Sequence, residues 1–438
     1  MTRAVAAAVR RIQTGSALSA FGAGFTVPYL YVYVAQVRGL GAGAAGLVLA
    51  VFALAALVVL PFVGRAIDRR GPLPVLVGAA LMAASGAAGL GFANGVPLAL
   101  LSASMLGAGT AVMQPALATL IVWCSDAETR TRAFATQFFL QNLGLGAGGL
   151  LGGQLVDVHR PGSFTLLFSF ESAMFLVLAG IVLSVRVPGI AAGAGSAEAV
   201  PGESEGAAPG GVRALLAHRA MVQFCALAFA VFFVCYGQFE SGLSAYGVEA
   251  AGVSPSTLGV ALAANTAMIV VAQFAVLRLV ERRRRSRVIA VVGLLWAVAW
   301  AAAGCAGLGH GGRATATGAF ITAYALFGLG ETMLSPTLAP LVADLAPAGT
   351  VGRYNSAFAL VKQLALAAGP AVGGPMAAAA HTPYVLTFLA LSLGVTVLAL
   401  RLGRRLAPAQ DLPLPARSRV VAAGGPAAER ITPDPAGA

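Results

Sequence analysis

Charge is the scarcest property of this sequence. Of its 438 residues only 10% are Asp, Glu, Lys or Arg, whereas 58% are hydrophobic. A soluble domain normally carries about 25% charged residues, and a soluble chain of this length needs them to cover two or three separate cores. The same apolar content excludes disorder for most of the chain. The sequence therefore predicts a polytopic membrane protein.

Cysteine, histidine and lysine are also rare, and their scarcity excludes classes of function. Four cysteines exclude a secreted disulfide scaffold, and no two of them form a C-x-x-C pair. The four histidines lie in predicted loops or at helix ends, and no P-loop or dinucleotide fingerprint is present. We therefore expect no enzymatic activity, no metal and no cofactor. Lys362 is the single lysine among 28 basic residues, a bias that indicates a high-GC bacterial genome.

Long apolar runs, by contrast, are abundant. A spanning helix needs about 20 mostly apolar residues. Twelve such runs are predicted, near residues 14–37, 43–63, 73–93, 97–122, 133–155, 164–185, 219–246, 256–277, 288–308, 315–342, 355–379 and 384–401. The first run is too long for a cleaved signal peptide, so we interpret it as a span. The expected fold class is an all-α membrane protein with twelve transmembrane helices.

The arginines predict the orientation of these spans. With twelve spans both termini lie on one side of the membrane. If that side is cytoplasmic, the inner segments hold 24 arginines and the outer loops hold three, which together with Lys362 account for all 28 basic residues. Such a bias is typical of cytoplasmic loops. It also explains the net charge of +12 without a nucleic-acid partner. We expect a monomer in the bacterial inner membrane with both termini in the cytoplasm.

Two polar segments predict the domain organisation. Residues 187–217 are rich in Gly, Ala, Pro and Glu, which is typical of a flexible cytoplasmic linker. Residues 406–438 are rich in Pro and Ala and are predicted to be a disordered tail. The segments between them are an N-terminal six-helix bundle, residues 1–186, and a C-terminal six-helix bundle, residues 218–405.

An internal repeat supports two related halves. In spans four to five and ten to eleven, equivalent residues are separated by 221 positions without a gap. The matched pairs include Gly109 with Gly330, Pro115 with Pro336, Arg132 with Arg353, Leu143 with Leu364, Gly148 with Gly369, Gly152 with Gly373, and Gly153 with Gly374. Earlier spans match at an offset of 213, as in Arg65 with Arg278 and Asp68 with Glu281. Such repeats are found in transporters built from two six-helix halves.

The loop between spans two and three reads GRAIDRRG. Gly64, Asp68, Arg69 and Gly71 match the G-x-L-a-D-r-x-G signature, so the chain resembles the major facilitator superfamily over roughly residues 10–405. The resemblance implies two six-helix bundles that rock around a central cavity. It also implies that this loop closes the cytoplasmic side, with Asp68 facing Arg353 at the start of span eleven. The second-half copy keeps Glu281 but lacks the glycines.

Glycine-rich sequences in spans five and eleven resemble the span-five signature of the antiporter branch, which ends G-P-x-x-G-G. Span eleven has the intact form, whereas Gly149 replaces the proline in span five. Small residues let helix backbones approach closely, and simple packing in a chain with 55 glycines is the alternative explanation. The residues concerned are Gly148, Gly152, Gly153, Gly369, Pro370, Gly373 and Gly374. The arginine usual on span four of that branch is missing, so its proton route cannot simply be transferred.

Ionisable residues inside the membrane are expensive and are therefore candidate functional residues. Glu331 is predicted near mid-membrane in span ten, where a carboxyl group in an apolar cavity can exchange a proton or serve as a structural, hydrogen-bonded group. Lys362 in span eleven either pairs with Glu331 or reaches toward the cytoplasmic interface. Glu240 in span seven either lines the cavity or marks its outer mouth. Glu171 in span six is expected to be structural.

Polar and aromatic residues complete the predicted cavity. The candidates for contact with the substrate are Gln114, Gln141, Asn142, Gln363, Tyr29 and Tyr33. Gln141 and Asn142 occupy the repeat positions of Lys362 and Gln363, which favours one shared ring. The amides alternatively join helices, and the tyrosines alternatively anchor span one at the membrane interface.

The predicted function is secondary active transport in which a proton gradient drives export of a small amphipathic molecule. A drug or a self-made metabolite fits this description, and antiport with protons is the expected mechanism. Uptake of a nutrient by symport or facilitated diffusion is the alternative. A membrane-embedded enzyme or a non-transporting sensor is a remote second alternative.

Overall fold

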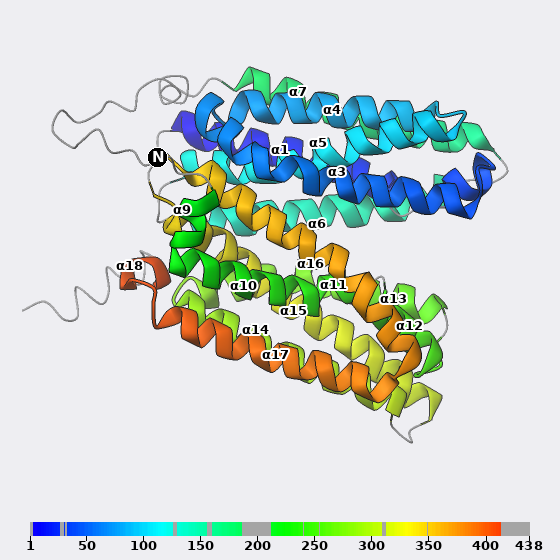
Figure 1. Cartoon of the computed structure of the whole chain (residues 1–438), viewed down its shortest axis with the longest axis vertical. Coiled ribbons are helices and arrows are strands. Elements are labelled where there is room, and N and C mark those ends of the chain that lie inside the picture. Colours follow the sequence, from blue (N-terminus) through cyan, green and yellow to red (C-terminus); the bar gives the residue numbers. More distant parts are fainter. Residues whose placement is uncertain are drawn as a thin grey trace, which may run out of the picture.

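The computed structural model describes residues 3–26, 30, 33–125, 129–155, 160–185, 212–239, 241–253, 255–308, 312–347 and 349–412, and the regular elements within these ranges are all helical. The first half of the chain contributes α1 (Arg3–Thr26), the short π-helix η2 (Tyr33–Val37), α3 (Gly41–Arg70), α4 (Pro72–Gly91), α5 (Val96–Trp123), α6 (Arg130–Leu155) and α7 (Pro161–Ser184). These elements form the upper bundle in Figure 1.

The second half forms the lower bundle in Figure 1. Its elements are α9 (Val212–Ala217), α10 (Arg219–Val234), α11 (Tyr236–Phe239), α12 (Gly242–Glu249), α13 (Pro255–Val280), α14 (Arg285–Leu308), α15 (Arg313–Leu345), α16 (Val351–Ala379), α17 (His381–Gly403) and α18 (Pro408–Asp411). Each half has its own large hydrophobic core.

Ten of the described helices are long and apolar enough to cross a membrane. With α1 and α6, and with α10 to α12 taken as one broken span, the described helices form the twelve predicted spans. The helices α1 and α6 are less apolar because they pack on each other through polar groups and glycines. Gln137 Nε2 donates to Ser16 Oγ at 2.6 Å, and Gln13 Nε2 donates to the carbonyl oxygen of Ala133 at 2.9 Å. The all-helical membrane fold with two six-helix halves is therefore confirmed.

The structure differs from the sequence prediction in the first and seventh spans. The first was predicted at 14–37, but α1 begins at Arg3 because Ala8, Val9 and Ile12 continue its buried face. The seventh was predicted as one helix over 219–246, but it is interrupted at Cys235. The interruption lies where α11 meets α16 backbone to backbone: a side chain on Gly369 would overlap Gly237.

The predicted linker and tail are shorter than expected. Residues 212–217 of the linker form α9, and residues 408–411 of the tail form α18. Leu406, in the segment before α18, is buried. Within α18, the carboxylate of Asp411 accepts hydrogen bonds from the backbone N–H and the hydroxyl of Ser286, at 2.8 and 3.0 Å. The prediction of disorder from residue 406 was therefore wrong for residues 406–412, and the rest of both segments lies outside the described residues.

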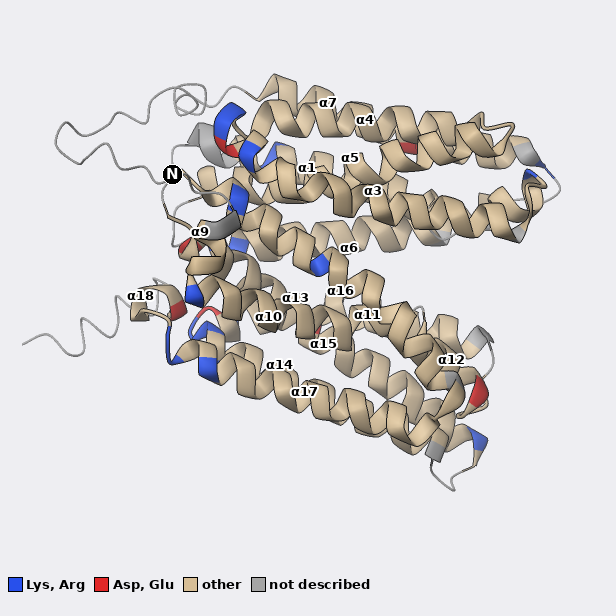
Figure 2. Cartoon of the chain, in the orientation of Figure 1, with Lys and Arg blue, Asp and Glu red and all other residues tan. Residues whose placement is uncertain are grey.

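Most of the Lys and Arg residues that are drawn in blue in Figure 2 lie at one end of both bundles. This end, called the arginine-rich end below, contains the last turns of α3 and α13 and the first turns of α6, α14 and α16. The opposite end carries Arg38, Arg160 and Arg313 among the described residues. The distribution is the one that the loop arginines predicted.

Candidate functional site: a central cavity between the halves

A cavity with a volume of about 190 Å³ lies between the two halves. The first half contributes α5 and α6, and the second contributes α10, α11, α15 and α16. Its walls are formed by Gln114, Pro115, Leu117, Ala118, Ile121, Phe134, Gln137, Phe138, Gln141, Phe232, Tyr236, Leu334, Ser335, Leu338, Ala339, Asn355, Phe358, Ala359 and Lys362. This composition, mostly apolar and aromatic with a few polar groups, is typical of a small-molecule site.

The polar groups on the two walls differ in kind. The first half supplies only neutral amides among the described lining residues, those of Gln114, Gln137 and Gln141. The second half supplies the ammonium group of Lys362 in addition to the neutral groups of Tyr236, Ser335 and Asn355. The Lys362 Nζ atom lies 5.2 Å from the centre of the Phe232 ring, in cation–π geometry. None of the described residues that line the cavity is Asp or Glu.

Glu331 lies one layer behind the wall, with 3% of its surface exposed. Asn265 Nδ2 donates to Glu331 Oε1 at 2.8 Å, and the hydroxyl of Tyr236, a cavity residue, also hydrogen-bonds to this carboxylate. Cys235 Sγ is 4.0 Å from the same oxygen. Glu331 and Lys362 are close enough to interact electrostatically, but the two residues, both of them described, form no direct ion pair.

The structure places Gln114 on the cavity wall, together with Gln141 and Lys362, which occupy equivalent positions of the repeat. Asn142 and Gln363 are not among the residues that line it. The Asn142 side chain instead donates to the carbonyl of Phe138 in its own helix, at 2.9 Å.

The prediction that Tyr33 contacts substrate was wrong. Tyr33 is fully buried inside the first half, stacked on Phe164 with ring centres 5.4 Å apart. Its hydroxyl donates to the carbonyl of Leu90 at 2.8 Å and accepts from Arg38 Nε at 2.6 Å. The aromatic ring thus serves packing. Two further candidates, Tyr29 and Glu240, lie outside the described residues.

Sequence reasoning missed most of the aromatic lining. Phe134, Phe138, Phe232, Tyr236 and Phe358 face the cavity, although their spacing does not distinguish them from core residues. A signal did exist for Ser335, because it is the repeat equivalent of Gln114 at the offset of 221.

Asp68 and Arg353 form a contact between the halves at the arginine-rich end, called the Asp68 contact below. The Asp68 carboxylate accepts the backbone N–H groups of Gly352 and Arg353 at 2.8 and 3.3 Å and pairs with Arg353 Nε at 3.2 Å. A Cβ atom on Gly64 would lie 2.6 Å from the Arg353 Cα, so this close approach requires glycine. Gly71 has φ +81° at the following turn, and Arg69 is exposed.

The second-half copy of the loop forms a more solvent-exposed contact, called the Glu281 contact below. Arg132 Nε lies 2.6 Å from Glu281 Oε1, and the Arg132 side chain is 69% exposed. Arg132 and Glu281 are the repeat equivalents of Arg353 and Asp68. The internal repeat therefore produces two ion pairs across the same interface.

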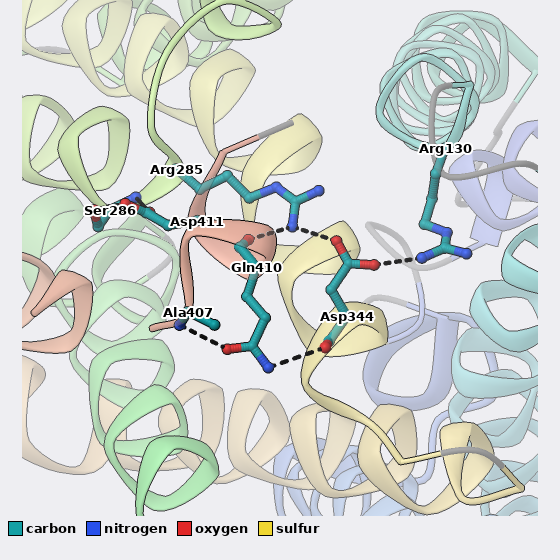
Figure 3. Close-up of polar contacts among 7 residues, drawn as sticks. All are labelled: Arg130, Arg285, Ser286, Asp344, Ala407, Gln410 and Asp411. Atoms are coloured by element: carbon teal, nitrogen blue, oxygen red, sulfur yellow. Dashed lines mark hydrogen bonds and ion pairs between the residues drawn. The ribbon is translucent and has the colours of Figure 1, made fainter. Parts of the chain in front are cut away.

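Asp344 forms a third contact at this end (Figure 3). Its carboxylate pairs with Arg130 of α6 at 2.5 Å and with Arg285 of α14 at 2.6 Å. Arg285 also donates to the backbone carbonyl of Gln410 in α18 at 2.8 Å. Asp344 thus connects the first half, the second half and the C-terminal segment.

These contacts restrict access to the cavity from one side. Between described residues, the hydrogen bonds and ion pairs that join the halves lie at the arginine-rich end or on that side of the cavity, where Asn355 Nδ2 donates to Thr119 Oγ1 at 3.0 Å. A small apolar cluster that includes Ile121, Phe134 and Ala343 fills the same region. The cavity is therefore closed toward the arginine-rich end.

The predicted packing glycines serve contacts within each half. A side chain on Gly148 would overlap the backbone of Phe21 in α1, and one on Gly373 would overlap Gln238 in α11. Gly374, in contrast, has open space beside it. Gly152 is buried, Pro370 lies inside α16, and the surroundings of Gly153 lie outside the description.

Glu171 lies far from this cavity, between α7 and α1. It is 1% exposed, and the Thr26 hydroxyl is hydrogen-bonded to it. Its position inside the first-half bundle fits the structural role expected from the sequence.

Two six-helix halves on either side of a central cavity are the architecture of a secondary transporter. The family model of the Major Facilitator Superfamily matches residues 14–295 and 248–432, so the chain belongs to this superfamily.

Known proteins resemble the chain in sequence or in fold. The multidrug resistance protein MdtG of Klebsiella pneumoniae (strain 342) is 30% identical over 164 residues, a match that spans 36% of this chain and 37% of that relative. The human organic anion transporter MFSD10 has a TM-score of 0.68 at 18% identity, with 90% and 98% of the two chains covered. The transporter FucP in its outward conformation has a TM-score of 0.70 at 16% identity, with 91% and 99% covered. At these identities the structural likeness concerns the fold alone.

Proposed function

We propose that this protein is a proton-coupled transporter that carries a small amphipathic molecule through the central cavity. The observation that carries the proposal is the position of Glu331. A fully buried carboxyl group is costly to ionise, and this one lies one residue layer from the cavity, hydrogen-bonded to the cavity residue Tyr236. Proton binding at Glu331 is thereby linked to the state of the substrate site.

The transport cycle alternates access to this cavity. We place the arginine-rich end in the cytoplasm of a bacterial cell, following the positive-inside rule. The conformation described here then opens to the outside and is closed inside by the Asp68, Glu281 and Asp344 contacts. Rocking of the two halves breaks these contacts and exposes the cavity to the cytoplasm. No cofactor, nucleic acid or second subunit takes part in this proposal.

Export is the direction that the sequence likeness favours, because the MdtG match names a multidrug resistance protein. A drug or a self-made metabolite then leaves the cell in exchange for protons.

Uptake by symport is the second candidate, and a specific observation favours it. Lys362 faces the cavity while Glu331 lies behind the wall, so neutralising Glu331 leaves a positive site that attracts an anion. A proton and an anion that favour each other's binding move together.

The test uses Glu331→Gln, which keeps the shape and removes the exchangeable proton. In proteoliposomes loaded with a pH-sensitive dye, addition of small aromatic probes to the wild type is expected to move protons. Glu331→Gln is expected to abolish this movement while leaving probe binding intact. Thr110→Ala, at the repeat position of Glu331, is the matched control and is expected to retain it. Unchanged proton movement in Glu331→Gln contradicts the proposal.

A further inference from the structure

The cavity carries one charged group on its wall, and that group is positive. Lys362 is the single Lys, Arg, Asp, Glu or His among the described lining residues. Its Nζ atom rests over the face of Phe232, which stabilises a cation only partly. A buried charge without a counter-ion is costly, so a ligand that brings a negative charge to this position is favoured.

The buried carboxylate of Glu331, behind the wall, does not take the place of an anion bound directly to Lys362. Glu331 receives hydrogen bonds from Asn265 and Tyr236, so neutral donors already satisfy it, and it makes no direct ion pair with Lys362 in the described structure. The other titratable group that faces Glu331 is the thiol of Cys235, 4.0 Å away.

Aromatic rings surround the lysine. The Phe232 ring centre lies 5.1 Å from that of Tyr236 and 5.9 Å from that of Phe358. All three rings line the cavity, and the amides of Gln114 and Gln141 face them from the first half. Aromatic rings in this arrangement offer edges and faces for stacking of a flat apolar body.

We propose that the substrate is an organic anion with an aromatic or similarly flat apolar body, whose negative charge is bound by Lys362. This inference rests on the proposed transport function and names the substrate class of the same cavity. Protonation of Glu331 strengthens binding of the anion, because it removes the one nearby negative charge. By reciprocity, anion binding strengthens proton binding at Glu331. This linkage favours movement of proton and anion in the same direction, so it supports the symport candidate over exchange for protons.

The experiment uses three probes with one ring system and different charge: 2-naphthoate, 2-naphthamide and 2-naphthylmethylammonium. Their affinities are measured by calorimetry with the full chain in phosphatidylcholine nanodiscs. The wild type is expected to bind the anion most tightly. Lys362→Gln is expected to weaken binding of the anion by roughly 30-fold or more, the usual effect of removing one partner of a buried charge pair. The neutral amide should bind with little change, which also shows that the variant is folded.

Two controls separate this effect from a general loss of charge. Lys362→Arg keeps the positive charge and is expected to retain the preference for the anion. Arg313→Gln removes one exposed charge at the opposite end from the arginine-rich end and is expected to change none of the three affinities. Tightest binding of the cation or the amide by the wild type, or an equal loss for all three probes in Lys362→Gln, overturns the proposal.

The pH dependence tests the linkage. Affinity of the wild type for 2-naphthoate is expected to increase as the pH is lowered within the range in which the probe stays ionised, because a protonated Glu331 no longer opposes the anion. In Glu331→Gln this dependence is expected to disappear. If the anion binds at Lys362 but no proton moves with it, the proposed proton coupling fails while the substrate class stands. If protons move with the amide or the cation and the anion is not preferred, the substrate class fails while the coupling stands.

Discussion

The Asp68 and Glu281 contacts use equivalent residues of the internal repeat, yet they differ in depth. The Asp68 side chain is 7% exposed and binds two backbone N–H groups in addition to Arg353. In the Glu281 contact, Arg132 is 69% exposed and the described interaction is between side chains. An exposed ion pair contributes little to stability, whereas a buried one with further hydrogen bonds is costly to break.

Glycine explains the difference. Gly64 allows α3 to touch the backbone of α16, since a Cβ on Gly64 would lie 2.6 Å from the Arg353 Cα. Gly352 leaves room for the Asp68 carboxylate, because a Cβ there would lie 2.5 Å from Asp68 Oδ1. At the repeat positions in the second contact, Leu277 and Thr131 carry side chains. Both copies of the repeat have the charged residues, but only the Asp68 contact has the close approach of the helices that buries them. Residue size therefore decides which ion pair holds the halves together.

The cavity walls show the same inequality between halves. Lys362 and Glu331 of the second half correspond to Gln141 and Thr110 of the first at the offset of 221. The first half thus offers neutral hydrogen-bonding groups where the second offers charge. We infer that the second half carries the ion and charge chemistry, and that the first half supplies shape.

The largest expected effect is that of Asp68→Ala. Removing the carboxylate leaves two backbone N–H groups and the Arg353 guanidinium without this acceptor, at a cost of about 2–3 kcal/mol. Thermal unfolding in detergent measures the loss, and reagents that label cysteines placed on the cavity side of the contact measure opening at the arginine-rich end. If Asp68→Ala costs no more unfolding free energy than removal of the Glu281 contact, the two contacts do not differ in the way proposed.

Moving the positive charge from one cavity wall to the other tests the comparison between Lys362 and Gln141. In Lys362→Gln with Gln141→Lys, the ammonium group moves to the repeat position on the first half, which lines the same cavity. The double variant is expected to recover about tenfold of the anion affinity lost in Lys362→Gln, because the charge still faces the ligand. Binding of 2-naphthoate measures the recovery. No recovery means that the neighbours of Lys362, not its charge alone, define the site.

A smaller effect is expected at the start of α14. In the first half the equivalent helix, α4, begins with Pro72, which has no backbone N–H, whereas α14 is capped by Asp411 from the distant α18. Asp411→Ala is expected to lower the free energy of unfolding by about 1 kcal/mol, as loss of a helix cap does. Asp411→Asn keeps an acceptor and is expected to retain most of it. Equal melting temperatures for the wild type and the alanine variant contradict a capping role.

The smallest effect is expected for Arg132→Ala, at roughly 0.2–1 kcal/mol, because the Arg132 side of the pair with Glu281 is exposed and screened by salt. The difference from the wild type should shrink further at high ionic strength. If Arg132→Ala loses as much stability as Asp68→Ala in the same thermal assay, solvent exposure does not explain the difference between the two contacts.

Much of the fold could be predicted because a bilayer imposes a simple rule on composition. The twelve runs and the arginine bias followed from that rule, and the loop resemblance led to the proximity of Asp68 and Arg353 that the structure shows. The faces of individual helices were harder. Tyr33 and Gln363 were chosen by residue type, but helix rotation is set by neighbours that lie far away in sequence, such as Phe164 for Tyr33.

The interruption at Cys235 and the docking of α18 had no local sequence signal. The first depends on contact between Gly237 and Gly369, 132 residues apart, and the second on a carboxylate that binds a helix start 125 residues earlier. In both cases the partner is chosen by the assembled bundle. The role of Glu331 and Lys362 remains a prediction. It rests on the position of Lys362 on the cavity wall and on the burial of Glu331 behind it.

The arrangement around Asp344 has a consequence for the energy of opening. Its two arginine partners belong to different halves, so separation of the halves breaks the pair with Arg130 and leaves the pair with Arg285 intact. The carboxylate therefore keeps a cation at every stage of the movement and never stands as an uncompensated charge. Arg130, freed at the membrane surface, is hydrated by water. In the proposed transport cycle, this arrangement lets the halves separate without leaving the Asp344 carboxylate unpaired.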